Sequence, residues 1–266
     1  MRSNRLRLPA FATVLTALLA GLCYAPPTPQ TRPNPNPNRV EPGPKKPGTL
    51  RIVFFGDSIT GHRPLEPYRH QYIKFADLVG MLGEAKLGEG KVEVLNTGWA
   101  GDKTTPKPSE YWPGGLGRAQ RDIADLDPDI VVILFGGNDK PTEPEQIALT
   151  QKNLNKIASV ATASTDRTLM LLYPDPMPRP EGKAWPLNLA NPLIKKAAEQ
   201  AGAKLLDLDG PMKRAEPRFG RAALANAVDG VHLAPAGEMV FAQAIYRKLD
   251  QLGWIKLPPS EQSGKD

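Results

Sequence analysis

The chain has 266 residues and a formal net charge of +6, with 34 Lys or Arg against 28 Asp or Glu. Seven of those basic residues and one of the acidic residues lie in residues 1–48, so residues 49–266 hold 27 of each sign and are formally neutral. Nucleic-acid binding needs a clustered basic face, so this balance argues against a nucleic-acid partner and fits one well-buried domain of about 210 residues.

The first 25 residues have the layout of a secretory signal peptide. An apolar run over residues 8–22 follows a basic start that contains Arg2, Arg5 and Arg7. Proline and threonine interrupt this run, whereas a transmembrane helix needs about 20 mostly apolar residues; an uncleaved anchor stays open as the alternative. We therefore expect the protein to be exported, and to be secreted, periplasmic or associated with the cell envelope.

Cys23 is the only cysteine, so the chain has no intrachain disulfide. It lies at the end of the apolar run, where a bacterial lipoprotein carries its lipidated cysteine, and lipidation would tether the N-terminus to a membrane. The lipoprotein motif has a small residue before the cysteine, whereas this chain has Leu22. Alternatively, Cys23 is lost when the signal peptide is cleaved. Both interpretations stay open.

A proline-rich segment separates this leader from the folded part of the chain. Nine of the 23 residues in 26–48 are proline, and the segment has no apolar periodicity, which predicts an extended, disordered linker. The predicted organisation is therefore a leader over 1–25, the linker over 26–48, one domain over 49–258 and a polar tail over 259–266.

Strand-like and helix-like segments alternate along the domain. Short apolar runs rich in β-branched residues predict buried strands over 50–55, 91–96, 129–136, 167–174 and 203–210. Longer amphipathic segments predict helices over 67–83, 116–126, 144–163, 191–202 and 234–253. This alternation predicts an α/β fold, with a central parallel sheet of about five strands covered by helices on both faces. Ligand sites in such folds lie beyond the carboxyl ends of the strands.

Chemically informative residues follow the predicted strands. Ser58 follows the first strand, Gly98 the second and Asn138 the third, while Asp229 and His232 precede the last helix. A serine hydroxyl needs a neighbouring base to act as a nucleophile, and an unperturbed histidine, with a pKa of about 6.5, is mostly neutral near pH 7. An aspartate three residues before that histidine can hold its other ring nitrogen and fix the tautomer.

Attack by a serine creates an oxyanion, which needs hydrogen-bond donors placed in advance. Gly98 offers a backbone N–H with no side chain in the way, Asn138 offers a side-chain amide, and the Ser58 N–H is a third candidate. Loss of one such donor typically costs about 2.7–4 kcal/mol of transition-state stabilisation. Each of these short sequences alone is a common turn, but together they predict a serine hydrolase.

The sequence resembles the SGNH hydrolases, also called GDSL-type esterases and lipases. The four marker blocks of that family are present in order, between residues 56 and 237, as GDSIT, NTGWAG, GGND and DGVHLAPAG. The usual GDSL reads GDSI here, which is a conservative change. The serine does not lie in the G-x-S-x-G elbow of the α/β-hydrolases, which disfavours that fold.

The resemblance implies a role for each matching residue. Ser58 would be the nucleophile, His232 the base and Asp229 the partner of that histidine. Gly98 and Asn138 would complete an oxyanion hole with the Ser58 amide. The resemblance also implies a flavodoxin-like three-layer α/β/α sandwich, and the reaction needs no metal or organic cofactor.

Aromatic residues in two long, proline-rich loops are candidate substrate contacts. Tyr111 and Trp112 fall in the loop over 105–115, and Trp185 falls in the loop over 173–187. Flat aromatic rings can stack on sugars, but they can equally anchor long loops onto a domain, and both readings stay open. For Trp99, between two glycines, a structural role is favoured.

Other polar residues near the site have simpler interpretations. Asp57 could be a second acid, but a hydrogen bond that braces the Ser58 loop is favoured. His62 and His70 are predicted to be solvated loop histidines, and Lys140 a solvated charge. Three scattered histidines give little support for a metal site.

The predicted function is an exported serine esterase that hydrolyses carboxylic esters through an acyl-enzyme on Ser58. O-acetyl groups on carbohydrate are the favoured substrate, because of the export signal and the loop aromatics. A lipase or lysophospholipase acting on lipid esters, and an acyltransferase with the same serine, are the enzymatic alternatives. A non-catalytic glycan-binding module is the third, since a fold does not guarantee activity.

Overall fold

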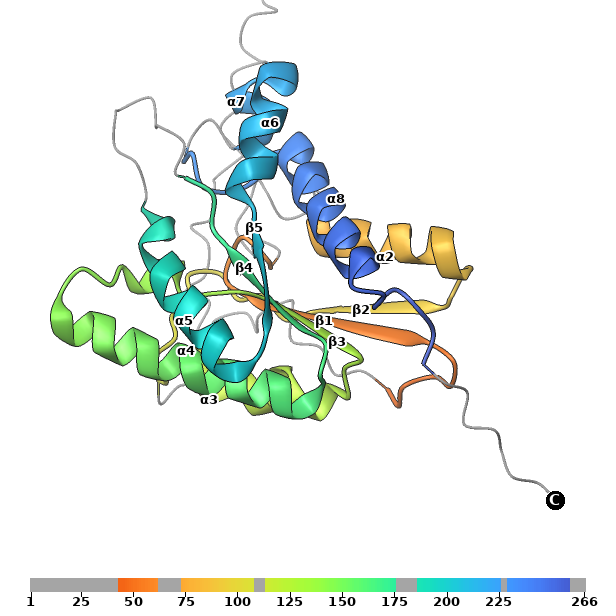
Figure 1. Ribbon diagram of the computed structural model, residues 1–266, viewed down its shortest axis with the longest axis horizontal. Helices are drawn as coiled ribbons and strands as arrows, with labels where there is room; N and C mark the ends of the chain where they lie inside the picture. Colours follow the sequence, from red (N-terminus) through yellow and green to blue (C-terminus); the bar gives the residue numbers. More distant parts are fainter. Residues whose placement is uncertain (1–42, 62–72, 108–112, 176–185, 226–228, 259–266) are drawn as a thin grey trace, which may run out of the picture. The chain divides into compact units, whose positions relative to one another are not determined.

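The computed structural model describes residues 43–61, 73–107, 113–175, 186–225 and 229–258. Its centre is a sheet of five parallel strands (Figure 1), namely β1 Leu50–Gly56, β2 Val92–Asn96, β3 Ile130–Leu134, β4 Thr168–Leu172 and β5 Lys204–Asp207. The strand order is β2-β1-β3-β4-β5, and each neighbouring pair is parallel. This is the order of flavodoxin-like sheets, so the predicted fold class is confirmed.

Helices cover both faces of the sheet, which gives three layers (Figure 1). One face carries α3 Gly115–Asp122, α4 Pro144–Ser164 and α5 Asn191–Ala201. The other carries α2 Phe75–Leu87, α6 Asp209–Phe219 and α8 Pro235–Gln251. Short helical segments connect these elements: the 3₁₀ turns Ala124–Leu126, Gly137–Asp139 and Leu187–Ala190, and α7 Arg221–Leu224. None of the described helices is long and apolar enough to cross a membrane.

Strand β1, which lies between β2 and β3, contributes to both halves of the core, because successive side chains of a strand point to opposite faces. The Phe54 ring meets Phe75 of α2 edge-on, with 5.8 Å between ring centroids, and Phe75 meets Phe241 of α8 at 5.6 Å. The next residue, Phe55, instead packs edge-on against Phe135 at 5.3 Å. All seven residues of β1 are buried, so the end of this strand is a rigid support for the turn at residues 57–61.

The helix predicted over 67–83 begins later, at Phe75; residues 67–72 lie outside the described part of the chain. A contact from α8 sets this start. The Glu238 carboxylate accepts hydrogen bonds from the Phe75 N–H at 2.8 Å and from the Lys74 Nζ at 2.5 Å. Periodicity within one segment cannot reveal a cap that comes from a residue 163 positions away.

Two further element predictions were wrong at their ends. The helix predicted over 116–126 stops at Asp122, and residues 124–126 form a 3₁₀ turn instead. The strand predicted over 203–210 stops at Asp207, because α6 begins at Asp209. Helix α6 was not predicted: Pro217 lies inside it and Met212 is its one buried side chain, so it shows no apolar stripe.

The predicted leader lies outside the described residues, as do most of the predicted linker and the tail. Residues 43–48, at the end of that linker, contact the domain. Lys45 pairs with Asp129 at 2.6 Å, and the Gly43 carbonyl accepts a hydrogen bond from Arg51 at 3.1 Å.

Candidate active site

The turn after β1 presents Ser58 at the carboxyl end of the sheet. Strand β1 lies between β2 and β3, where the chain order of the strands reverses, and ligands of such sheets bind at this point. Gly56 ends the strand where there is no room for a side chain. A Cβ atom on it would lie 2.0 Å from the Thr60 Oγ1 and 2.7 Å from the Leu134 carbonyl oxygen.

The structure brings Ser58, His232 and Asp229 together in a hydrogen-bonded chain. The His232 Nε2 lies 2.8 Å from the Ser58 Oγ, and the His232 Nδ1 lies 2.8 Å from the Asp229 Oδ2. The other Asp229 oxygen accepts the backbone N–H groups of Val231 and His232, at 2.9 and 3.0 Å. The aspartate thus holds both the ring and the backbone of the histidine, which lies just before α8.

The charge of Asp229 fixes the histidine tautomer. Burial disfavours the charged carboxylate, but the hydrogen bonds from the His232 ring and from two backbone N–H groups outweigh it and lower the pKa of Asp229 to about 2. An acceptor at Nδ1 places the ring proton there, which leaves the Nε2 lone pair to accept the Ser58 proton. The arrangement is therefore chemically able to deprotonate the serine.

Gly98 lies against the turn that follows Ser58. A Cβ atom on Gly98 would lie 2.2 Å from the Gly61 nitrogen, so the close approach of the two loops requires glycine here. The Asn96 side chain also links these loops. Its Nδ2 donates to the Thr60 carbonyl at 2.8 Å, and its Oδ1 accepts the Gly98 N–H at 3.1 Å.

Asn138 lies in the 3₁₀ turn after β3 and contacts the loop after β2. Its Nδ2 donates to the Asp102 carbonyl at 3.0 Å. A side-chain amide carries two N–H bonds, so one remains for an oxyanion. Gly98 and Asn138 thus follow the two strands that flank β1, at the same edge of the sheet as Ser58.

Asp57 braces the Ser58 turn, as predicted, and also connects it to the neighbouring loops. Its Oδ1 accepts the Ile59 N–H at 2.9 Å, and its Oδ2 accepts the hydroxyl of Tyr173, at the end of β4, at 2.7 Å. The Tyr173 oxygen accepts the Gly137 N–H at 3.3 Å, next to Asn138. Burial raises the pKa of Asp57 to about 6, although the hydrogen bonds from Ile59 and Tyr173 and the nearby His232 act in the opposite direction.

The Asp57→Asn variant is expected to change how stability depends on pH. The pKa of Asp57 is higher in the folded than in the unfolded protein. The contribution of this carboxyl group to stability is therefore fully present below about pH 4 and is lost as the pH rises through 6. Between pH 4 and pH 7, the free energy of unfolding of the wild type should fall by about 2–3 kcal/mol relative to the variant. Urea unfolding at several pH values measures this difference, because the other carboxyl groups are common to both proteins.

The matched control is Asp166→Asn, because the Asp166 side chain is 94% exposed. This control should follow the wild-type pH dependence. A constant difference between the wild type and Asp57→Asn across this pH range would show that Asp57 does not take up a proton in the folded protein.

Several predicted residues lie outside the described part of the chain. These are the aromatic candidates Tyr111, Trp112 and Trp185, together with His62 and His70. Trp99 is buried, with 2% of its surface exposed, which fits the favoured structural role, and Lys140 is exposed. Within the described ranges, no group of three or more His, Cys, Asp or Glu residues could hold a metal ion.

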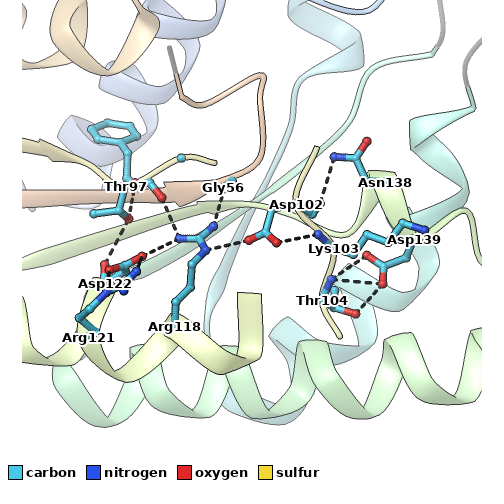
Figure 2. Close-up of polar contacts among 12 residues, drawn as sticks. Gly56, Thr97, Asp102, Lys103, Thr104, Arg118, Arg121, Asp122, Asn138 and Asp139 are labelled. Carbon is cyan, nitrogen blue, oxygen red and sulfur yellow. Dashed lines mark hydrogen bonds and ion pairs between the residues drawn. The ribbon is translucent and has the colours of Figure 1, made fainter. Parts of the chain in front are cut away.

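A buried polar network beneath the site was not predicted (Figure 2). Arg118 of α3 is its centre, and its guanidinium binds the Asp102 carboxylate at 2.7 Å. The only sequence signal was the position of Asp102, directly after the NTGWAG block; Arg118 lies in no motif. Tyr173 also lies in no motif, and the sequence around it predicts only the end of an apolar strand.

Solved structures share this fold. A lipase/acylhydrolase from Enterococcus faecalis has a TM-score of 0.58 and 24% identity, over 80% of this chain and 100% of that one. An acetylxylan esterase from Geobacillus stearothermophilus has a TM-score of 0.57 and 22% identity, over 77% and 96%. An alpha/beta hydrolase enzyme from the metagenome of Lake Arreo, Spain, has a TM-score of 0.58 and 22% identity, over 79% of this chain and 98% of that one. A search of curated proteins found no significant match.

A family model gives the more specific result. The model of the GDSL-like lipase/acylhydrolase family matches residues 54–240, which is more than half of the chain. The match contains Ser58, Gly98, Asn138, Asp229 and His232, and it confirms the family resemblance that the four sequence blocks indicated. The chain therefore belongs to the GDSL-like lipase/acylhydrolase family and is an ester-hydrolysing enzyme.

Proposed function

We propose that this enzyme is an exported serine esterase that removes O-acetyl groups from carbohydrate through an acyl-enzyme on Ser58. The observation that carries the proposal is the chain of two 2.8 Å contacts from Ser58 through His232 to Asp229. His232 takes the Ser58 proton as the oxygen attacks the ester carbonyl, and it then protonates the departing alcohol. A water molecule, deprotonated by the same histidine, then attacks the acyl-enzyme, and the carboxylic acid leaves Ser58.

The oxyanion of each step is bound by the Ser58 N–H, the Gly98 N–H and the second Nδ2 hydrogen of Asn138. In the resting enzyme the Gly98 N–H donates to Asn96 Oδ1. The oxyanion is a stronger, charged acceptor than that neutral amide oxygen, so it competes for the Gly98 donor only while the tetrahedral intermediate exists.

The size of a neighbouring pocket supports a short acyl group. Ile59, next to Ser58, and Val231, next to His232, line a mainly apolar pocket with Tyr173, Leu187 and Phe241. The free volume is about 30 Å³. One water molecule needs about 10–15 Å³ of such free volume, so the pocket holds about two groups of that size. An acetyl methyl group fits such a space, whereas a long alkyl chain does not.

The carbohydrate part of the proposal has other support. The acetylxylan esterase from Geobacillus stearothermophilus shares the fold, and the predicted export signal would bring the enzyme to extracellular glycans. Tyr111, Trp112 and Trp185 are proposed to stack on sugar rings next to the acetylated position.

Covalent trapping combined with a substrate panel tests the proposal. A fluorophosphonate should label the enzyme once, on the peptide that contains Ser58, and should abolish hydrolysis of p-nitrophenyl acetate. Acetate release from acetylated xylan should exceed hydrolysis of p-nitrophenyl octanoate. Labelling at another residue, with activity intact, would refute the serine mechanism. Faster octanoate hydrolysis would indicate a lipase-type enzyme, and ester formation only with an added sugar acceptor would indicate an acyltransferase.

A further inference from the structure

Arg118 is a fully buried arginine beneath the candidate active site. Its side chain is 0% exposed and its carboxylate partner, Asp102, is also 0% exposed. The guanidinium stacks on the Phe55 ring, 4.0 Å from the ring centroid. Burying a charge is costly unless that charge is paired and its donors are satisfied, so the partners of this arginine specify its geometry.

Those partners lie in the segments that carry the oxyanion donors (Figure 2). The Arg118 Nη2 donates to the Gly56 carbonyl at 2.7 Å, two residues before Ser58. The Nη1 donates to the Thr97 carbonyl at 2.8 Å. A peptide unit is planar, so fixing the Thr97 carbonyl also fixes the direction of the Gly98 N–H in the same plane.

The third contact reaches Asn138 through Asp102. The Asp102 carboxylate accepts the Arg118 Nε hydrogen at 2.7 Å, and the Asp102 carbonyl accepts the Asn138 Nδ2 hydrogen at 3.0 Å. A parallel link lies beside it. The Asp139 carboxylate accepts the Thr104 N–H at 3.0 Å and the Thr104 hydroxyl at 2.7 Å. The loop after β2 and the turn after β3 are thus joined twice.

We propose that Arg118 is a positioning residue. Together with the hydrogen bonds between Thr104 and Asp139, it holds the three oxyanion donors, on Ser58, Gly98 and Asn138, in their positions. The inference rests on the proposed serine mechanism, and it assigns to a residue outside the four family blocks a role in the rate of that mechanism. An oxyanion hole works because its donors need no reorganisation during the reaction. The planar fork of an arginine can hold two carbonyl groups and a carboxylate in fixed directions, whereas the point charge of a lysine cannot.

Arg118→Lys tests the proposal because it keeps the charge and loses the fork. We expect kcat for p-nitrophenyl acetate to fall by about 100-fold with little change in KM, because donors displaced by about 1 Å fail in the transition state. Asn138→Ala removes one of the positioned donors. In that background, Arg118→Lys should lower kcat by a smaller factor than it does in the wild type. The same factor in both backgrounds would overturn the proposal.

The chain offers a matched control at the other end of β1. Arg51 is also buried, and it binds the Glu93 carboxylate at 2.7 Å and the carbonyls of Leu126 and Gly43 at 2.7 and 3.1 Å. Arg51→Lys should lower the urea midpoint of unfolding but leave kcat unchanged. If both variants lose stability and neither loses kcat, Arg118 is only structural.

Two further measurements cover the cases in which Arg118→Lys does not fold or the serine mechanism itself fails. If Arg118→Lys does not fold, Thr104→Val replaces it, because valine keeps the shape and removes the hydroxyl bond to Asp139, together with a 3.4 Å contact from the Asn153 Nδ2. An unchanged kcat in that variant would refute the proposal, whereas a fall of about 10-fold would support it. Fluorophosphonate labelling of the wild type separates the two hypotheses. Without labelling at Ser58 the serine mechanism fails, and with labelling any failure concerns Arg118 alone.

Discussion

Ser58→Ala is expected to lower kcat for p-nitrophenyl acetate by about 10⁵- to 10⁶-fold, which is the usual cost of removing a catalytic serine. The substitution removes the Oγ that lies 2.8 Å from the His232 Nε2, and no acyl-enzyme can then form. The backbone N–H of residue 58 stays in place, so weak catalysis by the remaining oxyanion donors should persist. The free energy of unfolding should change by less than about 1 kcal/mol, because only one partly exposed atom is lost.

Ser159→Ala is the matched control for this variant. Ser159 is an exposed serine of α4, and its hydroxyl donates to the Asn155 carbonyl at 2.8 Å. That variant should retain wild-type kinetics. Retention of more than a few per cent of the activity by Ser58→Ala, after contaminating esterases are removed, would refute the role of Ser58.

Asp229→Asn is expected to lower kcat by about 10⁴-fold although the fold is kept. The new amide can place an N–H opposite the His232 Nδ1, which moves the ring proton to Nε2 and blocks acceptance of the Ser58 proton. The amide oxygen can still accept the N–H groups of Val231 and His232, which now bind the carboxylate at 2.9 and 3.0 Å. Steady-state kinetics at pH 7, with circular dichroism to check folding, measures this effect.

The low pKa of Asp229 predicts the pH range in which this residue can affect activity. Because hydrogen bonds keep the pKa at about 2 despite burial, the carboxylate is charged throughout pH 4–9, and its stabilising effect is lost only as the pH falls from about 4 towards 2. Loss of wild-type activity between pH 7 and pH 4 should therefore not arise from Asp229. Asp250→Asn, at an exposed carboxylate of α8, should match the wild type at every pH. A variant Asp229→Asn with kcat within tenfold of the wild type would contradict the proposed role.

Much of the architecture could be predicted because it depends on local patterns. Strands buried on both faces are short apolar runs, and all of β1, β3 and β4 is buried. Helix α6 could not be predicted, because it covers the sheet with few buried residues and contains Pro217. The start of α2 could not be predicted either, since Glu238 sets it from another helix.

The site shows the same division between local and distant information. The blocks that contain Ser58 and His232 could be recognised because the chemistry of a triad restricts residue types at fixed short spacings. Arg118 could not be recognised, because the partners that connect it to the site lie 16, 21 and 62 positions away. Its local partner, Asp122, lies four positions on at 3.1 Å and predicts only an ordinary ion pair within a helix. A buried charge is defined by the segments that meet around it, and that meeting is a property of the fold.

The shared guanidinium also has a consequence for how this enzyme can diverge. Gly56, at the end of β1, and Thr97 and Asp102, in the loop after β2, bind the same side chain, so a substitution in one of these two segments changes which residues the other tolerates. These two segments should behave as a single heritable module with strong epistasis among their positions. A chimaera that exchanges one of them with a homologue should lose activity, whereas an exchange of both together with α3 should keep it.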